Sequence, residues 1–325
     1  MLQDSDFHHS PVMLEECIDA LAVVSDGIYV DCTAGGGGHS IHIAERLSSK
    51  GRLISLDKDP KALATCEIKR QTLKDKDKWL LVKSDYSQID SVLRDLGIDK
   101  VDGVLADLGV SSYQIDTAER GFSYLKEGPL DMRMDTAQAL SAEVVVNEYG
   151  VDELVSILHD YGEERYAKRI VEAIDRERRI APIRTTTKLA SIVASAMPAA
   201  SKREDQHPAR RTFQAIRIEV NNELRSVSRL LEVTPSLLNN KGRFAVISFH
   251  SLEDRLVKES FKKLETSCVC PREFPVCVCG NRSYGRSITN KPIVASKEEA
   301  ATNKRSACAK LRIFERNQEQ WPRKM

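Results

Sequence analysis

Between residues 28 and 110 the chain alternates between short apolar runs rich in β-forming residues and stretches with apolar residues at helical spacing. The runs are predicted to be strands, and the stretches between them helices. Strands that alternate with helices in this way are typical of a parallel sheet with helices on both faces. The predicted strands cover 27–32, 51–57, 79–85 and 101–110, and the predicted helices cover 40–49, 59–73 and 87–97.

The alternation stops after Asp107, and the next clear strand pattern covers residues 242–250. The residues between carry apolar positions at helical spacing, so this part is predicted to be helical. We expect its last long helix, over 209–233, to return the chain to the sheet, to which residues 310–317 add a final strand. The predicted organisation is a sheet domain formed by 1–114 and 213–325, with a helical insertion at 115–212.

The first predicted strand ends near Asp31 and leads into four consecutive glycines at 35–38, followed by His39. In a sheet of this kind a glycine turn lets a ligand approach the backbone, and an acid at the end of the second strand accepts hydrogen bonds from ribose hydroxyls. Asp57 ends the second predicted strand about 20 residues beyond the glycines, which is the spacing expected of that acid. The pattern favours a nucleoside-type cofactor over an ordinary tight turn.

The residues after the glycines distinguish three cofactors. A nucleoside triphosphate needs Gly-Lys-Ser/Thr at the start of the helix, and this chain has His39 and Ser40 there. A dinucleotide needs a third glycine where the helix packs on the strand, and this chain has Ile41 and His42. S-adenosylmethionine has no pyrophosphate, so its methionine part can lie near Asp31, where two phosphates would be repelled. The loop therefore favours S-adenosylmethionine.

Composition sets limits on the class of protein. With 325 residues, 41% of them hydrophobic, the chain can bury the core of one large domain with an insertion, or of two domains. Lys and Arg (49) almost balance Asp and Glu (48), so the net charge gives no argument for a nucleic-acid partner. No stretch approaches the roughly 18 apolar residues of a membrane span, and no signal peptide is recognisable. We expect a cytoplasmic protein, with no membrane partner, in a reducing compartment.

Seven blocks between His9 and Lys258 carry a family resemblance, which continues to the last predicted strand at 310–317. They read HSPVMLEE, VDCTAGGGGHS, LDKDPKAL, DLGVSSYQIDTAERGFSYLKEGPLDMRMD, YGEERYAKRI, HPARRTFQAIRIEVNNEL and ISFHSLEDRLVK. In this order they resemble the motifs of the RsmH (MraW) family of bacterial methyltransferases. That family transfers a methyl group from S-adenosylmethionine to N4 of cytidine 1402 in the decoding centre of 16S ribosomal RNA.

The resemblance implies an α/β fold, the Rossmann-like class I S-adenosylmethionine-dependent methyltransferase fold, with a helical insertion that recognises the substrate. It implies S-adenosyl-L-methionine as cofactor and 16S rRNA, within the small ribosomal subunit, as partner. A homodimer is compatible with the sequence, which decides neither the oligomeric state nor whether the substrate is free RNA or an assembled subunit.

Carried over by position, the family's cofactor contacts fall on seven residues. Tyr86 takes the aromatic position beside the adenine, where phenylalanine is also found, and either ring can stack. The glycine loop and Asp57 are also predicted from the residues themselves, whereas Tyr86, Asp107 and Gln114 come mainly from the resemblance. The seven are Gly37, Gly38, His39, Asp57, Tyr86, Asp107 and Gln114.

Methylation of N4 of cytosine needs the amine held in line with the methyl group and acceptors that localise its lone pair. Many amino-methyltransferases place an Asp/Asn-Pro-Pro-aromatic turn after the fourth strand for this purpose, and this chain has DLGVSS there. The catalytic base is therefore not assigned. Asp107 is predicted to bind or position the cofactor. Ser111 is predicted to contact the cytosine base of the substrate.

Other side chains are candidates for substrate contacts. His250 lies at the end of the strand predicted over 242–250, near the predicted cofactor site. A contact with the substrate and a hydrogen bond within its own turn fit the sequence equally well. A hydrolase triad with Ser251 and Asp254 is excluded, because adjacent Ser and His cannot easily face each other and no nucleophile elbow is present. Arg133 is a predicted phosphate contact. Basic residues predicted to hold the RNA backbone are Lys202, Arg203, Arg210 and Arg211, whereas Arg176, Arg178, Arg179 and Arg184 are predicted to form a solvated helix face.

The eight cysteines do not suggest a disulfide framework in so long a chain. Four of them, Cys268, Cys270, Cys277 and Cys279, form two C-x-C pairs. Four thiolates can bind zinc, but these pairs are tighter than the usual C-x2-C knuckle. The prediction is a reduced loop without a metal, with zinc binding left open.

Three other functions are kept as alternatives. The chain could methylate an amine of another RNA or DNA base, because fold and cofactor site do not fix the acceptor. It could be a ribosome-assembly factor that binds RNA and has lost catalysis, against which the intact Asp57, Asp107 and glycine loop argue. A nicotinamide oxidoreductase is disfavoured by the missing third glycine.

Overall fold

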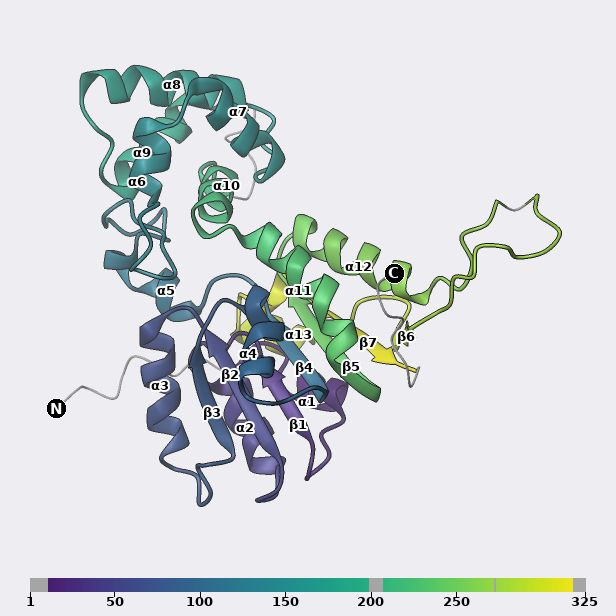
Figure 1. Cartoon of the computed structure of the whole chain (residues 1–325). Helices are drawn as coiled ribbons and strands as arrows, with labels where there is room; N and C mark the ends of the chain where they lie inside the picture. Colours follow the sequence, from purple (N-terminus) through teal and green to yellow (C-terminus); the bar gives the residue numbers. More distant parts are fainter. Residues whose placement is uncertain (1–10, 199–206, 272, 318–325) are drawn as a thin grey trace. The chain divides into compact units, whose positions relative to one another are not determined.

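The computed structural model describes residues 11–198, 207–271 and 273–317 (Figure 1). The chain divides into two compact units. Val110–Glu223 belong to a helical unit, whereas His8–Gly109 and Leu224–Met325 belong to a sheet unit. Across the described ranges, no helix is both long and apolar enough to cross a membrane.

The described part of the sheet unit holds a seven-stranded sheet in the order β3-β2-β1-β4-β5-β7-β6. Neighbouring strands from β3 to β5 are parallel, and β7 is antiparallel to both β5 and β6. The parallel region confirms the fold class expected from the alternation of strands and helices. The strands are β1 (Ile28–Asp31), β2 (Arg52–Asp57), β3 (Trp79–Lys83), β4 (Val101–Asp107), β5 (Leu238–Ser248), β6 (Gly285–Ser287) and β7 (Lys310–Arg316).

Helices cover both faces of this sheet (Figure 1). Along β1, Tyr29 packs in one hydrophobic cluster and Val30 in the other, because successive side chains of a strand point to opposite faces. Burial on both faces explains why the strands read as nearly continuous apolar runs. The Tyr29 side is covered by α1 (Leu14–Leu21), α2 (Gly38–Arg46) and α3 (Pro60–Arg70), and the Val30 side by α4 (Ile89–Asp95), α11 (Glu223–Leu237) and α12 (Ser251–Glu265).

The strand order reverses beside β1, since β2 pairs with one of its edges and β4 with the other. Ligands of open α/β sheets bind outside the carboxyl ends of the strands at such a switch point. Here β1 ends at Asp31, β2 at Asp57 and β4 at Asp107. The topology therefore brings three carboxylates to one edge of the sheet, which is the edge formed by the carboxyl ends of its parallel strands.

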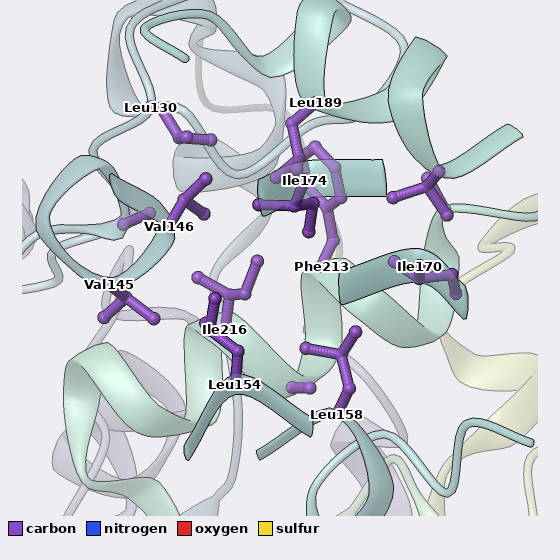
Figure 2. Packing of buried hydrophobic residues seen from close by; sticks show 14 of the residues in the cluster. Leu130, Val145, Val146, Leu154, Leu158, Ile170, Ile174, Leu189, Phe213 and Ile216 are labelled. Atoms are coloured by element: carbon purple, nitrogen blue, oxygen red, sulfur yellow. The ribbon is translucent and has the colours of Figure 1, made fainter. Parts of the chain in front are cut away.

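The helical unit has its own hydrophobic core, part of which is shown in Figure 2. Phe213 and Ile216 of α10 pack in this core with Leu154 of α7 and Ile174 of α8. The helices are α5 (Ser112–Asp116), α6 (Ala142–Glu148), α7 (Val151–Asp160), α8 (Ala167–Ile180), α9 (Thr186–Ala196) and α10 (Arg210–Asn221).

The structure differs from the predicted elements at two helix breaks. The predicted helix over 209–233 is divided into α10 and α11, because Asn222 adopts the left-handed conformation (φ 53°) that ends α10. A second left-handed residue, Glu163 (φ 48°), lies between α7 and α8. Consequently α10 packs in the helical core, and only α11 reaches the sheet. Helices α1 and α13 (Lys297–Thr302) and the short β6 were not predicted.

A buried amide joins helix α10 to the loop that contains Met132 and Met134. The Asn221 side chain accepts a hydrogen bond from Met134 N (2.8 Å) and donates to Met132 O (2.7 Å) and Arg217 O (2.9 Å). Asn221 stands in the EVNNEL block, and both methionines stand in DMRMD. These distant sequence blocks are therefore parts of one contact.

We predict that Asn221→Leu lowers the free energy of unfolding of the helical unit by about 2–4 kcal/mol, because buried backbone groups lose their partners. Hydrogen exchange of residues 110–223 measures this locally, which avoids assuming two-state unfolding of a chain with two units. The control is Lys168→Ala on the exposed side of α8, with an expected change within about 0.5 kcal/mol. Equal protection in both variants would contradict the role of Asn221.

Candidate active site

Asp31, at the end of β1, is buried and fully engaged by protein groups. Its Oδ1 accepts from Thr33 N (3.0 Å), and its Oδ2 accepts from Ser40 Oγ (2.6 Å). The Ser40 hydroxyl lies 2.8 Å from Ser55 Oγ, which accepts from Trp79 Nε1 (2.8 Å). Since Ser40 gives its proton to Asp31, the chain of donors runs from Trp79 through both serines to the carboxylate. Asp31 therefore shapes the loop that follows it.

The glycine loop is required by packing within the protein as well as by any ligand. Gly35 (φ 50°) and Gly37 (φ 72°) adopt left-handed conformations that disfavour other residues. A Cβ on Gly37 would lie 3.1 Å from the Sγ of Cys66. On Gly38 it would lie 2.4 Å from the Cγ of Pro11. The two predicted cofactor-loop glycines therefore also let α2 start closely against its neighbours.

His39 follows this loop in the first turn of α2 and is only 5% exposed. Its Nε2 lies 3.0 Å from the carbonyl oxygen of Val12. Because a carbonyl can only accept, Nε2 carries a proton and donates it to Val12 O. The segment before α1 thus fixes the orientation of the His39 ring.

Asp57 links the end of β2 to the glycine loop. Its Oδ2 accepts from Gly35 N (2.8 Å) and its Oδ1 from Asp59 N (2.9 Å). Burial raises the pKa of Asp57 to about 6, although these two N–H donors act to lower it. A carboxylate has about four acceptor positions, so each oxygen keeps capacity for a further donor such as a ribose hydroxyl.

Tyr86 begins the short 3-10 turn (Tyr86–Gln88) that follows β3, and its ring packs at the edge of the cluster on the Val30 side. The turn is held by Asp85, which accepts from Ser87 N (2.9 Å) and pairs with Lys58 Nζ (3.2 Å). Burial acts to raise the pKa of Asp85, but Lys58 and Ser87 hold it below its ordinary value. Lys58 immediately follows Asp57, so the ion pair connects the ends of β2 and β3.

Asp107 ends β4 at the switch point. Its backbone N–H donates to Thr33 Oγ1 (2.7 Å), which ties β4 to the glycine loop. Its Oδ1 is buried and has no hydrogen-bond partner among the described residues. Burial raises the pKa of Asp107, the charges of His39 and Arg305 oppose this, and Asp31 and Glu253 add to it.

Two of those neighbours were not among the predicted site residues. Arg305 lies over the ring of Phe249, with Cζ 5.7 Å from the centroid, and Glu253 accepts from Phe249 N (2.8 Å). Both residues are far from Asp107 in sequence, and no spacing rule connects them to it. The ISFHSLEDR block, which contains Phe249 and Glu253, was the only sequence motif that pointed to these surroundings of Asp107.

His250 is the N-cap residue of α12. Its Nδ1 accepts from Glu253 N (3.4 Å), and its Nε2 lies 3.2 Å from Glu253 Oε1. The side chain is almost buried. The Nδ1 bond fits a histidine bonded within its own turn, but Nε2 is buried without a hydrogen-bond partner among the described residues, so both interpretations stay predictions.

The remaining predicted residues lie in the helical unit and make local contacts. Ser111 and Gln114 form a capping box at α5, in which Ser111 N donates to Gln114 Oε1 (3.0 Å) and Gln114 N donates to Ser111 Oγ (3.2 Å). Arg133 forms two 2.8 Å hydrogen bonds with Asp131 and donates from Nη1 to Gln138 O (2.8 Å). These bonds to Asp131 raise the pKa of Arg133. Each of the three has a structural role here, and their predicted ligand roles stay predictions.

The basic residues named from the sequence also make local contacts where the structure describes them. Arg178 and Arg179 pair with Asp175, and Arg184 lies 3.8 Å from Glu143. Arg211 makes a long hydrogen bond to Glu163 O (3.4 Å). Lys202 and Arg203 lie outside the described residues.

Taken together, the carboxyl ends of β3, β2, β1 and β4 carry Tyr86, Asp57, the glycine loop and Asp107. Asp57 offers acceptors for ribose, and the buried Oδ1 of Asp107 is suited to a donor on a ligand. The loop lacks the Gly-Lys-Ser/Thr of a nucleoside triphosphate site, since His39 and Ser40 follow the glycines. The sheet and this edge define a Rossmann-like S-adenosylmethionine-dependent methyltransferase.

Comparison with known proteins gives the family. Residues 6–317 match the MraW methylase family, and the chain belongs to it. A protein of Clostridium botulinum (strain Kyoto / Type A2) named ribosomal RNA small subunit methyltransferase H is 51% identical over 308 residues, covering 95% of this chain and 98% of its own length. One of the same name from Clostridioides difficile (strain 630) is 48% identical over 311 residues, covering 96% and 99%.

A solved structure of an rRNA methylase from Streptococcus thermophilus is similar over 95% of this chain and 98% of its own. The identity is 10% and the TM-score 0.44. This distant likeness adds nothing to the family assignment.

The pKa of Asp57 gives a pH prediction. Ribose hydroxyls donate to the ionised carboxylate, whereas below pH 6 most Asp57 side chains in the free protein are protonated. The dissociation constant for S-adenosylmethionine is therefore expected to rise about tenfold between pH 7 and pH 5 through this group, as measured by calorimetry.

The matched control is Asp57→Asn, which removes this titration while Asp107 and the cofactor's own groups still titrate. It is expected to bind more weakly at pH 7 and to show a smaller loss of affinity on acidification. A variant with unchanged affinity at pH 7 would contradict the assignment of Asp57 to ribose.

Proposed function

We propose that this chain transfers the methyl group of S-adenosylmethionine to N4 of a cytidine in 16S ribosomal RNA, at the position equivalent to cytidine 1402. The single observation that carries the substrate class is the match to small-subunit rRNA methyltransferases at 51% identity over nearly the whole length of both chains. The N4 position and the particular cytidine rest on the resemblance of the sequence blocks to the RsmH (MraW) family.

We further propose how the described residues hold the cofactor. Asp57 accepts from the ribose hydroxyls, Tyr86 lies against the adenine, and the buried Oδ1 of Asp107 receives a donor from the cofactor. The backbone of Gly37, Gly38 and His39 lines the loop beside it. Support comes from the open acceptor positions of Asp57 and from the unsatisfied oxygen of Asp107, which costs free energy until it is paired. Gln114 is a further contact on the resemblance alone.

Methylation of N4 of cytosine requires particular contacts from the residues of the protein. When bound, S-adenosylmethionine supplies an electrophilic methyl group on a sulfonium. The N4 lone pair of cytosine is delocalised into the ring, so acceptors must orient the amine, and one N4 proton must leave as the new N–C bond forms. Asp107 stands at the strand end where amino-methyltransferases commonly place such an acceptor, but without the prolines and the aromatic residue that usually follow. We assign it to positioning.

RNA binding is proposed for the helical unit. The target base lies within structured RNA and must be unstacked to reach a pocket. Arg210 and Arg211 stand at the start of α10, and among the described residues the Arg211 side chain has the long bond to Glu163 O as its hydrogen bond. By contrast, the Arg179 side chain pairs with Asp175 and is 75% exposed, as expected of a solvated helix face. Arg178 does not fit that interpretation, because it is only 13% exposed and donates to Val146 O and Tyr149 O.

The deciding experiment is mass mapping of methylated cytidine in 16S rRNA from cells that lack this protein. We expect loss of N4 methylation at one cytidine and its return on expression of the intact chain. Loss at another base would favour the alternative amino-methyltransferase. An unchanged map would remove the proposed activity and favour an assembly factor without catalysis.

A second experiment tests Asp107. Asp107→Asn is expected to weaken S-adenosylmethionine binding about 10- to 100-fold, because the amide oxygen accepts a weaker hydrogen bond than a carboxylate and an NH2 donor replaces the second acceptor. The control is Asp26→Asn, an exposed acid before β1 at the opposite edge of the sheet, for which no change is expected. Equal binding by both variants would contradict the role of Asp107.

A further inference from the structure

Four cysteines gather in the segment between α12 and β6. Cys268 and Cys270 stand on its first limb, and Cys277 and Cys279 on its second. Figure 1 shows this segment as a long excursion from the end of α12. The sulfur atoms of all four lie within 4.8 Å of one another. The C-x-C spacing alone did not predict this, because it does not say that the two limbs meet.

The sulfur separations fit a single tetrahedral ion. They are 3.5 Å for Cys268–Cys277, 3.9 Å for Cys270–Cys277, 3.5 Å for Cys277–Cys279 and 3.9 Å for Cys268–Cys279. A disulfide needs about 2.05 Å, so none of these pairs is bonded. An ion with four sulfur ligands at about 2.3 Å places the sulfurs about 3.8 Å apart, the edge of a regular tetrahedron. A cluster of several irons, with its cysteines on different irons, would spread the sulfurs farther.

Backbone donors surround the sulfurs. Val269 N donates to Cys279 Sγ (3.4 Å), and Val278 N donates to Cys270 Sγ (3.3 Å). Each limb therefore donates to a sulfur of the other. Hydrogen bonds of this kind orient ligands and favour the negatively charged thiolate that a metal requires.

The segment has no core that could hold this geometry. None of its described residues from Ser267 to Gly280 is buried. Its apolar side chains point to solvent, with Val276 70% and Val278 72% exposed. A short segment without a core is usually held by a disulfide or a structural metal, and the sulfur distances exclude the disulfide.

We propose that Cys268, Cys270, Cys277 and Cys279 bind one structural Zn²⁺ ion. Four cysteine ligands leave no open coordination position, so the site is structural and takes no part in methyl transfer. Binding converts any protonated thiols to thiolates and releases their protons to solvent, with no change of oxidation state. Soft thiolate ligands favour zinc over the hard cations Mg²⁺ and Ca²⁺.

The first test measures metal in the full-length protein purified without chelators under reducing conditions. We expect about one zinc per chain by plasma mass spectrometry, and less than about a tenth of that in the double variant Cys277→Ser, Cys279→Ser. The matched control is Cys308→Ser, an exposed cysteine outside the cluster, which should keep its zinc. No zinc in the intact chain, or equal zinc in the double variant, would overturn the proposal, as would iron in its place.

A second measurement uses the unaltered sequence, in case the double variant does not fold. Zinc is removed with a chelator, and the apoprotein is titrated with Co²⁺, which should give the intense visible d–d bands of a tetrahedral thiolate site at one equivalent.

Pancreatic elastase cleaves after small apolar residues such as Val276 and Val278. Cleavage between residues 266 and 284 should accelerate at least tenfold on zinc removal and slow again when zinc is restored. The proposed zinc site would be contradicted by an octahedral spectrum of the cobalt-loaded protein, or by a cleavage rate that does not change with zinc.

Discussion

The buried carboxylate of Asp31 organises the edge of the sheet on which the proposed site depends. It accepts from Thr33 N and from Ser40 Oγ, and Ser40 continues through Ser55 to the indole of Trp79. These contacts join the end of β1 to the start of α2, to β2 and to β3. The Thr33 hydroxyl in turn accepts from Asp107 N, which adds β4. One charged group, buried at the switch point and paired on both oxygens, thus sets the course of the glycine loop.

The acids at this edge divide by how far the protein satisfies them. Asp31 is buried and accepts from Thr33 N and from the Thr33 and Ser40 hydroxyls, which suits a structural role. Asp57 accepts from two backbone N–H groups and keeps further acceptor positions, and Asp107 has a buried oxygen without a partner in the described part of the chain. Unsatisfied buried acceptors are costly, so they are the places where a ligand contributes most. This contrast supports Asp107 as a ligand contact, whereas the assignment of Asp57 rests on its position at the end of β2.

Much of the sheet could be predicted from the sequence, because strands buried on both faces give continuous apolar runs and the helices between them keep their own period. The register of Asp57 relative to the glycines followed from the same topology. The break at Asn222 could not be predicted from periodicity, since the apolar pattern runs through it and only the local left-handed backbone turns α10 away from α11. The contacts of Arg133 with Asp131 and of His250 with Glu253 could not be predicted either, because a sequence does not show which neighbouring side chains pair. Arg305 and the meeting of the four sulfurs depend on contacts that no local pattern encodes.

The pairing of β4 with β5 has a consequence for how the chain folds. Asp107 lies opposite Ile247, so 139 residues separate the two positions. At about 5–20 residues per second, a ribosome needs roughly 7–28 s to make that stretch. During this time β4 is the outer strand of a half-sheet, with its second row of N–H and C=O groups unpaired and open to association with other chains. The helical unit, whose segment 110–223 is complete before β5 is made, can fold in that interval, whereas β4 stays an outer strand until β5 has been synthesised.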